Sequence, residues 1–499
     1  MNDYELGATH NKQTLSAKPP RRQGKRLPQY IATLSVSLGA LATGTVQGWT
    51  GNITDELQNG NFNNIDIDSS DIKWIGSCAT LGSMVMCFPN GIISEKLGRK
   101  VALLIIAALF ICGWLFIVFA NCTMMINIGR FITGMGSGAF LIMFPVYVSE
   151  IAEKEIRGAL IIMAGYTPFG ITLVYVLGYA VDAQLCTIIV TVAPFLFMIA
   201  MLFQSETPLY RIKQGKEAEA RSILIRLRGD SYDVDTELKE IKAVIEEDRK
   251  NQSSFKDSLM KSNTKKALGI CFSLMFFQQG GGFKAVLFYT SNIFQSSGAE
   301  LDPKISTIII GIVQIIAVVF GILVIDKLGR RIVLLLSGAV MALGLIIIGA
   351  FFTLSERQLV SLQTLSNLGF MPLLGLVLFN IAFAVGYGAL PWMMCAELLP
   401  PEIKGMGTAA ASTFSWLIAF LVTNLYFDIK MAIGGDSTFY VFAAICILSV
   451  VFVFFVVPET KGRSLYQIQM ELSGRKHQIE GVENKGFELK SISSQKNNS

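Results

Sequence analysis

Histidine is almost missing from this chain: its 499 residues include two, His10 and His477, and both lie in polar terminal stretches. Charged residues are scarce as well, at 16% of the chain against about 25% in soluble domains. The eight cysteines fall in or beside apolar stretches and show no metal-ligand spacing. We therefore expect no histidine relay, metal site, cofactor or disulfide framework. Because no nucleophile–base pair or phosphate-binding loop is present, we do not expect an enzyme.

What the chain does have is apolar sequence, which makes up 52% of its residues. It is arranged in segments of about 20 residues, the length that a helix needs to cross a bilayer. The expected spans are Tyr30–Trp49, Trp74–Ile93, Val101–Ala120, Met124–Val148, Ala159–Ala180, Thr187–Phe203, Ala267–Ile293, Ile305–Ile325, Ile332–Phe352, Phe370–Met394, Thr408–Phe427 and Thr438–Val457. The prediction is an all-α membrane protein with twelve transmembrane helices.

The distribution of charge predicts the topology. The first span follows a polar tail that ends in Arg21-Arg22-Gln-Gly-Lys25-Arg26, which favours a retained, cytoplasmic N-terminus over a signal peptide. Residues 50–71 contain five acidic residues, no Lys or Arg, and the sequon Asn52-Ile53-Thr54, so Asn52 is a candidate glycosylation site in an outer loop. We expect a multi-pass plasma membrane protein with both termini cytoplasmic. Its net charge of +5 predicts contact with the lipid bilayer and not with nucleic acid.

Residues 205–266 are rich in charge and divide the chain into two similar parts. Ala218, Ile223, Leu224 and Leu227, and then Leu238, Ile241 and Ile245, recur at helical spacing, which predicts short cytoplasmic helices. The expected units are a tail (1–29), a six-helix half (30–204), linker helices (205–266), a second six-helix half (267–457) and a tail (458–499).

Several motifs occur twice, once in each half, and others occur once. They are Gly91-Ile-Ile-Ser-Glu-Lys-Leu-Gly-Arg99 and Gly321-Ile-Leu-Val-Ile-Asp-Lys-Leu-Gly-Arg330, Pro145-Val-Tyr-Val-Ser-Glu-Ile-Ala152, Arg157-Gly158, Gln278-Gln279, Gly386-Tyr-Gly-Ala-Leu-Pro-Trp392 and Pro458-Glu-Thr-Lys-Gly-Arg463. As a set they resemble the sugar porter family of the major facilitator superfamily, most of all its facilitated trehalose-transporter branch. The resemblance implies the major facilitator fold, with two pseudo-symmetric halves, and a small-molecule sugar as substrate. We expect a monomer.

Charges at the inner ends of the spans are duplicated in the same way. The set comprises Glu95, Arg99, Glu150, Arg157, Glu206, Asp326, Arg330, Glu397, Lys404 and Glu459. They either fix the orientation in the membrane or, as the resemblance implies, form a conformational latch between the halves. The duplication favours the latch, although each exposed pair contributes only about 0–1 kcal/mol.

The seventh span combines polar residues with three consecutive glycines, in the run Gln278-Gln279-Gly-Gly-Gly-Phe-Lys284. Each glycine weakens a helix by about 1 kcal/mol relative to alanine, so we expect a break that lets Gln279 and Lys284 face one cavity. The resemblance implies that Gln278 and Gln279 bind sugar hydroxyls and that Trp392 belongs to the same site. Lys284 and Gln314 are the other candidate substrate-binding residues, although they do not match the family pattern. Lys284 and Gln314 stand where the family usually has asparagine. Trp392 could equally be a core residue.

Proton coupling can be weighed from the first span, because coupled sugar porters have an acid there, facing an arginine like Arg130. Tyr30–Trp49 contains no Asp or Glu, and Arg130 is expected to bond helix carbonyls. The sequence therefore predicts facilitative uniport of a sugar such as trehalose or a hexose by alternating access. Two alternatives remain open: transport of another solute, anionic or polyol, through Lys284, and a sugar sensor that does not transport.

Overall fold

The computed structural model describes residues 25–58, 62–63, 65, 67–153, 155–164, 167–230, 232–252, 255–288, 290, 293, 302–463 and 465–472. Every regular element in these residues is a helix, so the expected all-α class is confirmed. The helices are α1 (Leu27–Gln58), α2 (Ser69–Leu97), α3 (Arg99–Val118), α4 (Thr123–Ile151), α5 (Arg157–Ala164), α6 (Pro168–Ala180), α7 (Ala183–Leu202), α8 (Pro208–Lys213), α9 (Glu217–Arg228), α10 (Val234–Gln252), α11 (Phe255–Met260), α12 (Ser262–Gly280), α13 (Phe283–Phe288), α15 (Pro303–Leu328), α16 (Arg330–Glu356), α17 (Leu362–Asn367), α18 (Met371–Val385), α19 (Leu390–Leu398), α20 (Pro401–Ile433), α21 (Gly435–Val456) and α22 (Leu465–Leu472).

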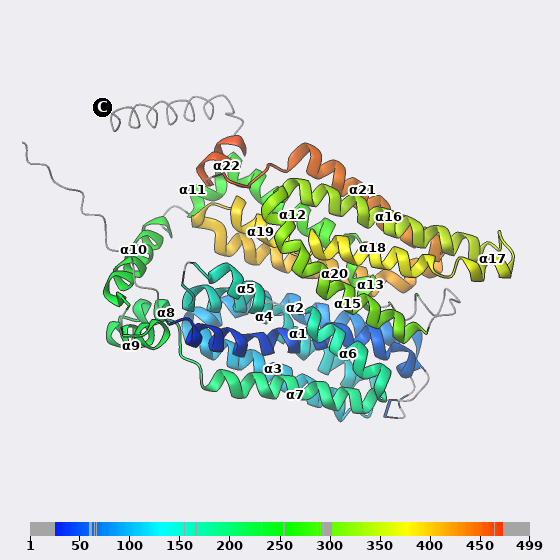
Figure 1. The fold of residues 1–499 in the computed structure, drawn as a ribbon, viewed down its shortest axis with the longest axis horizontal. Helices are drawn as coiled ribbons and strands as arrows, with labels where there is room; N and C mark the ends of the chain where they lie inside the picture. The colour runs from blue at the N-terminus through cyan, green and yellow to red at the C-terminus, as the bar shows by residue number, and fades with distance from the viewer. Residues whose placement is uncertain are drawn as a thin grey trace, which may run out of the picture.

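The long helices lie side by side in two groups (Figure 1). Helices α1–α7 form one half of the bundle, and α12–α21 form the other. Helices α8–α11 and α22 lie together at one end of the bundle, which we call the linker end; α17 marks the opposite end.

Most of the long helices in the bundle have the length and the apolar composition of membrane spans. In the described residues, nine helical stretches are long and apolar enough to cross a membrane. The other three of the twelve expected spans correspond to α1, to α5 with α6, and to α12 with α13. The first helix differs from the prediction, because it continues past Trp49 to Gln58. Ile53 and Leu57, one turn apart, are both buried, so this apolar face carries the helix beyond the polar residues around it.

The seventh span breaks where the glycines predict it. Helix α12 ends at Gly280 and α13 begins at Phe283. Between them Gly282 has φ +86°, a left-handed conformation that side chains disfavour, and a Cβ there would lie 2.8 Å from the Phe442 ring. In the fifth span, predicted as Ala159–Ala180, helix α5 is described to Ala164 and α6 begins at Pro168; residues 165 and 166 lie outside the described part.

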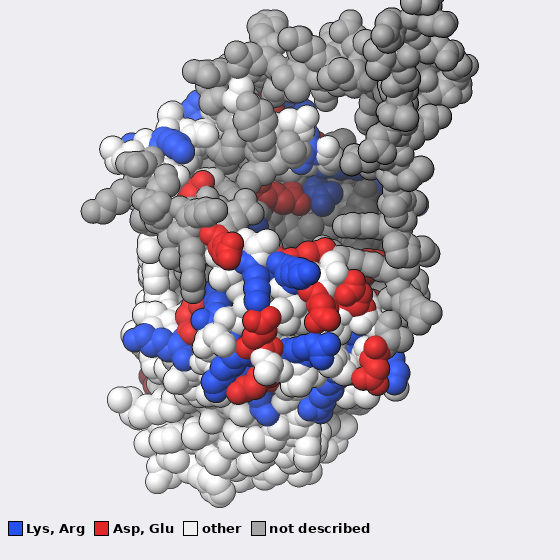
Figure 2. Space-filling model, turned by 90° about the vertical axis from the view of Figure 1, so that its left-hand side faces the viewer, with Lys and Arg blue, Asp and Glu red and all other residues white. Residues whose placement is uncertain are grey.

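The linker is helical, as expected, and is anchored to the first half. In α9 the buried face carries Ala220, Leu224 and Leu227, whereas Ala218, predicted to belong to it, is exposed. Arg228 donates to Glu237 and to the Ile151 carbonyl oxygen of α4. Figure 2 looks onto this end and shows basic and acidic side chains interspersed over it.

Candidate substrate site and charge clusters

A small cavity lies inside the bundle, between the halves. Its lining residues come from α1, α2 and α4 of the first half and from α13 and α20 of the second: Val46, Gln47, Ala79, Thr80, Ser83, Gly134, Ser137, Lys284, Phe288 and Trp416. Water centres can occupy about 10 Å³ of it, enough for one water molecule and far too little for a sugar. The conformation is therefore closed around the cavity, and a ligand enters only if the halves move apart.

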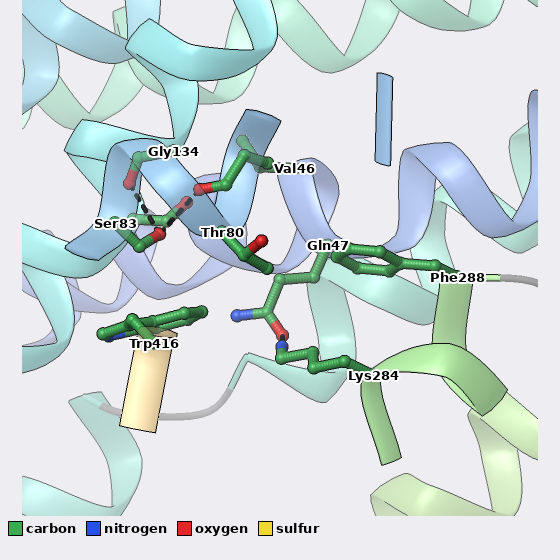
Figure 3. Close-up of a pocket in the computed structure, with 10 residues that line it drawn as sticks. Val46, Gln47, Thr80, Ser83, Gly134, Lys284, Phe288 and Trp416 are labelled. Carbon is green, nitrogen blue, oxygen red and sulfur yellow. Dashed lines mark hydrogen bonds between the residues drawn. The ribbon is translucent and has the colours of Figure 1, made fainter. Parts of the chain in front are cut away.

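Lys284 projects into this cavity from α13 and is 4% exposed. Its Nζ donates a hydrogen bond to Gln47 Oε1 at 2.9 Å, across the boundary between the halves. Figure 3 shows the two side chains end to end, with the Trp416 ring nearby. Nζ also lies 5.4 Å from the Trp416 ring centre and 5.6 Å from those of Phe283 and Phe288, within cation–π range. The sequence did not identify Gln47, because its partner is 237 residues away.

Gln278 and Gln279 make other contacts. Gln278 Nε2 donates to the Tyr387 carbonyl oxygen at 2.7 Å, so it bridges the break in the seventh span to the break between α18 and α19. Gln279 Nε2 donates to Gln278 Oε1 and to Ser415 Oγ. The two glutamines are not among the residues that line the cavity, and the expected meeting of Gln279 with Lys284 is therefore indirect. Ser415, which contacts Gln279, and Trp416, which lines the cavity, are adjacent on α20 and so connect the glutamines to the cavity.

Sixteen buried side-chain polar atoms have no hydrogen-bond partner among the described residues, and Ser137 Oγ, Gln279 Oε1 and Gln314 Oε1 are among them. These three residues are at most 6% exposed. Because an unpaired buried polar atom is costly, such atoms in a cavity wall indicate a place for a ligand or water. Gln314 lies on α15, while Trp392 is half-buried on α19 and packs against the apolar core. Neither lines the closed cavity.

Arg130 on α4 bonds helix carbonyls, as expected. Its guanidinium donates to the Val46 and Ile75 carbonyl oxygens and to Thr50 Oγ1, at 2.8, 3.1 and 2.7 Å. Val46 is itself a cavity residue, so this buried cation lies directly behind the cavity wall.

The charge cluster of the first half is built around Arg99. The guanidinium donates to Glu150 at 3.0 Å, to Glu95 at 2.9 Å and to the Ser94 carbonyl oxygen. Glu206 accepts from the backbone N–H groups of Arg99 and Lys100. A carboxylate at the N-terminus of α3 neutralises the helix dipole and satisfies donors that the helix leaves free.

The second half repeats the arrangement. Arg330 pairs with Glu397 at 3.3 Å, and Glu459 accepts from the N–H groups of Arg330 and Arg331 at the N-terminus of α16. Although burial raises the pKa of Glu459, hydrogen bonds from four backbone N–H groups outweigh it and hold that pKa below its ordinary value. Gly98 and Gly329, just before the two capped helices, have φ +101° and +93°, which explains the glycine in both motifs.

The remaining residues of the predicted charge latch make fewer or weaker contacts. Arg157 donates only a long bond, 3.5 Å, to the Ala152 carbonyl oxygen, and Lys404 is exposed beside a groove lined by Arg330 and Glu397. The side chains of Asp326 and Asn52 lie outside the described part. At the linker end, the ion pairs of the described residues lie within one half, within the linker, within the segment after α21, or between a half and the linker; they do not bridge the halves in this conformation.

The opposite end carries pairs that do bridge the halves. Glu56 of α1 pairs with Lys304 of α15 at 2.7 Å, and Lys73 of α2 pairs with Asp428 of α20 at 3.1 Å. Glu56 also accepts from the Ala183 N–H at the start of α7. Sequence reasoning assigned the acidic residues of this region to a loop and missed both pairs.

The helical bundle and its enclosed cavity define the protein as a multi-pass membrane protein with the major facilitator fold. The chain belongs to the family described as "Sugar (and other) transporter", whose profile matches residues 15–472. It is 35% identical to the facilitated trehalose transporter Tret1 of Polypedilum vanderplanki, over 91% of this chain and 90% of that protein. The Culex quinquefasciatus Tret1 is also 35% identical, over 95% and 92%. For the Drosophila grimshawi Tret1, again 35% identical, the chain spans about half of the relative's length (49%).

Solved structures show the same fold. The partially occluded, inward-open xylose transporter XylE from E. coli superposes with a TM-score of 0.73, covering 88% of this chain and 99% of that one at 22% identity. XylE bound to 6-bromo-6-deoxy-D-glucose gives a TM-score of 0.71 at 23% identity. At this identity the likeness establishes the fold.

Proposed function

We propose that this protein carries a sugar-type, hydroxyl-rich solute across the membrane by facilitated diffusion, through alternating access. Membership of the family and the name of the 35%-identical relatives support this function, with trehalose and hexoses as the first solutes to test. A uniporter needs no coupled ion, which fits the absence of acids from the described lining of the cavity.

The observation that carries the proposal is the cavity, with one unpartnered polar atom in its wall and two more outside it. Ser137 Oγ lines it, and Gln279 Oε1 and Gln314 Oε1 lie buried on neighbouring spans. A hydroxyl group both donates and accepts, so it can satisfy amide and hydroxyl oxygens alike. The rings of Trp416 and Phe288 offer apolar faces of the kind on which sugar rings pack.

For the topology, we propose that the linker end faces the cytoplasm of a plasma membrane protein, with both termini on that side. The basic residues gathered at this end agree with the positive-inside rule. The functional units would be the halves 30–204 and 267–457, the linker 205–266 and the two tails, in a monomer. Asn52 would be glycosylated on the outer side.

We also propose that the duplicated charges act as a latch. In the closed conformation, Arg99 and Arg330 are each paired inside their own half. When the two halves approach each other at the linker end, Arg157 and Lys404, which are more loosely held, are available to pair with carboxylates of the opposite half. Such exposed pairs bias the equilibrium by about 0–1 kcal/mol each.

The test is uptake of labelled solutes into liposomes that contain the purified protein. The expected result is saturable uptake that stops at the external concentration and is unchanged by an imposed pH gradient. Gln279→Ala should lower kcat/KM by about tenfold through loss of one substrate hydrogen bond, while Gln363→Ala, an exposed amide on α17, should not. Accumulation driven by an inward proton gradient would contradict uniport, and saturable binding without flux would favour the sensor.

A further inference from the structure

The cavity has one formal charge on its wall. Of the described residues that line it, Lys284 alone is ionisable; the others are apolar, hydroxyl or amide residues. An ammonium group has three donor hydrogens. Lys284 directs a hydrogen bond to one acceptor, Gln47 Oε1, and meets three aromatic rings. Ring faces attract a cation but are weaker partners than a carboxylate, which offers both charge and lone pairs.

The surroundings add positive charge. The Arg130 guanidinium bonds the carbonyl oxygen of Val46, so a second buried cation lies behind the same wall. A buried charge inside a membrane protein is costly, and where it persists it commonly faces the ligand path. A cation at Lys284, on the wall of a cavity whose described lining holds no carboxylate, favours a ligand of opposite sign.

We infer that the transported solute carries a carboxylate in addition to its hydroxyl groups, as a uronate or aldonate does, and that Lys284 binds that carboxylate. This inference rests on the proposed transport function and, within the hydroxyl-rich solutes, favours acidic sugar derivatives over neutral sugars such as trehalose and hexoses. Hydroxyl groups account for the unpartnered oxygens of Ser137 and Gln279, and the carboxylate accounts for Lys284.

Gln47 then holds the place of the ligand in the closed cavity. Its Oε1 occupies one donor of Lys284, and the contact joins α1 of one half to α13 of the other. An incoming carboxylate makes a charge-assisted bond to the same Nζ, stronger than a bond to a neutral amide, and displaces Gln47. Binding of the solute therefore breaks a contact between the halves at the point where they must separate. Gln47 is a positioning residue in this scheme, and Lys284 is the specificity-determining one.

The experiment compares glucuronate with glucuronamide, its neutral counterpart of nearly the same shape, together with glucose and trehalose. Uptake into liposomes is measured for wild type, Lys284→Gln, Lys284→Arg and a control, Lys239→Gln, which removes an exposed charge from α10. We expect wild type and the control to prefer glucuronate over glucuronamide by at least about tenfold in kcat/KM. Lys284→Gln should lose the preference and Lys284→Arg should keep it.

The outcomes distinguish a failure of the carboxylate inference from a failure of the proposed transport function. Wild-type uptake of neutral sugars with no preference for glucuronate would overturn this inference and leave sugar transport standing. A preference that survives in Lys284→Gln would also overturn it. If no solute is transported, the proposed function fails; stabilisation by glucuronate but not by glucuronamide, seen in detergent-solubilised wild type and lost in Lys284→Gln, would then still assign the carboxylate to this site, and equal effects of the two compounds would refute it. If Lys284→Gln does not fold, competition between the two compounds on wild type decides alone.

Discussion

The two ends of the bundle use charge in different ways. At the opposite end, the pairs Glu56–Lys304 and Lys73–Asp428 join one half to the other. At the linker end, Arg99 with Glu150 and Arg330 with Glu397 each hold helices of a single half together. The first kind of pair must break when the halves rock apart, whereas the second kind survives the motion.

Pairs that bridge the halves therefore affect the equilibrium between conformations, whereas pairs inside a half affect the stability of that half. Breaking a pair that bridges the halves removes a contact found in one state only, so it shifts the equilibrium between states. Breaking a pair inside a half affects every state and lowers the stability of that half. The predictions below test this division, beginning with the largest effect.

Arg99→Gln should destabilise the protein most. The Arg99 side chain is 4% exposed and its partner Glu150 is 10% exposed, so the variant leaves a buried carboxylate without its cation. Removal of one partner from a buried pair costs about 3–5 kcal/mol. The measurement is the thermal unfolding midpoint of the purified protein in detergent.

Arg330→Gln is the matched control from the second half. Arg330 is 17% exposed and Glu397 29%, at a longer distance of 3.3 Å, so the loss should be near 1 kcal/mol. Equal drops in the midpoint for the two variants would show that burial does not distinguish the clusters.

Glu56→Gln should open the opposite end with little change in the unfolding midpoint. Glu56 is 17% exposed and accepts from both Lys304 and the Ala183 N–H, so its charge contributes about 1–2 kcal/mol to the closed state. The expected sign is faster thiol labelling of a cysteine placed at Ser306, a buried position two residues from Lys304 where the change is nearly isosteric. The charge swap Glu56→Lys with Lys304→Glu should restore part of the slow labelling, because it restores the ion pair but not the acceptor of the Ala183 N–H. Labelling of the swap as fast as that of Glu56→Gln would indicate that the pair itself is not responsible.

Asp428→Asn should give the same change on a smaller scale. Asp428 is 45% exposed, and an exposed pair contributes less than about 1 kcal/mol. Salt screens such a pair, so raising the ionic strength to 1 M should mimic the variant in wild type. An effect larger than that of Glu56→Gln would reverse the order that burial predicts.

Glu459→Gln tests the smallest contribution. The pKa of Glu459 is lowered in the folded protein, so its stabilisation is present above the unfolded-state pKa and is lost as the pH falls through the folded pKa. A charge at a helix N-terminus contributes about 0.3–1 kcal/mol. At neutral pH the variant should unfold at a slightly lower temperature than wild type, and the difference should vanish in acid. A difference that persists in acid would assign the effect to packing.

Much of this architecture could be predicted because residues that are close together in the sequence determine it. The three glycines before Phe283 predicted the break in the seventh span, and the duplicated motifs predicted that Glu206 and Glu459 would play matching parts. The extension of α1 to Gln58 was missed although Ile53 and Leu57 have helical spacing, because polar neighbours masked the face.

The site itself depends on register between distant helices, which spacing along the chain does not encode. Gln47 meets Lys284 only because α1 and α13 pack together, and Glu56 meets Lys304 across 248 residues. The sequence could identify Lys284 as anomalous. Its partners required the packed bundle.

Distances between spin labels across the halves test the division between the ends most directly. One label pair, at Gln184 and Gln363, reports the opposite end; the other, at the mirrored positions Lys96 and Lys327, reports the linker end, and all four side chains are exposed. In proteoliposomes, Glu56→Gln should lengthen the first distance and shorten the second, because the halves rock about the cavity between them. Unchanged distances at both ends, or changes of the same sign at both, would contradict the account.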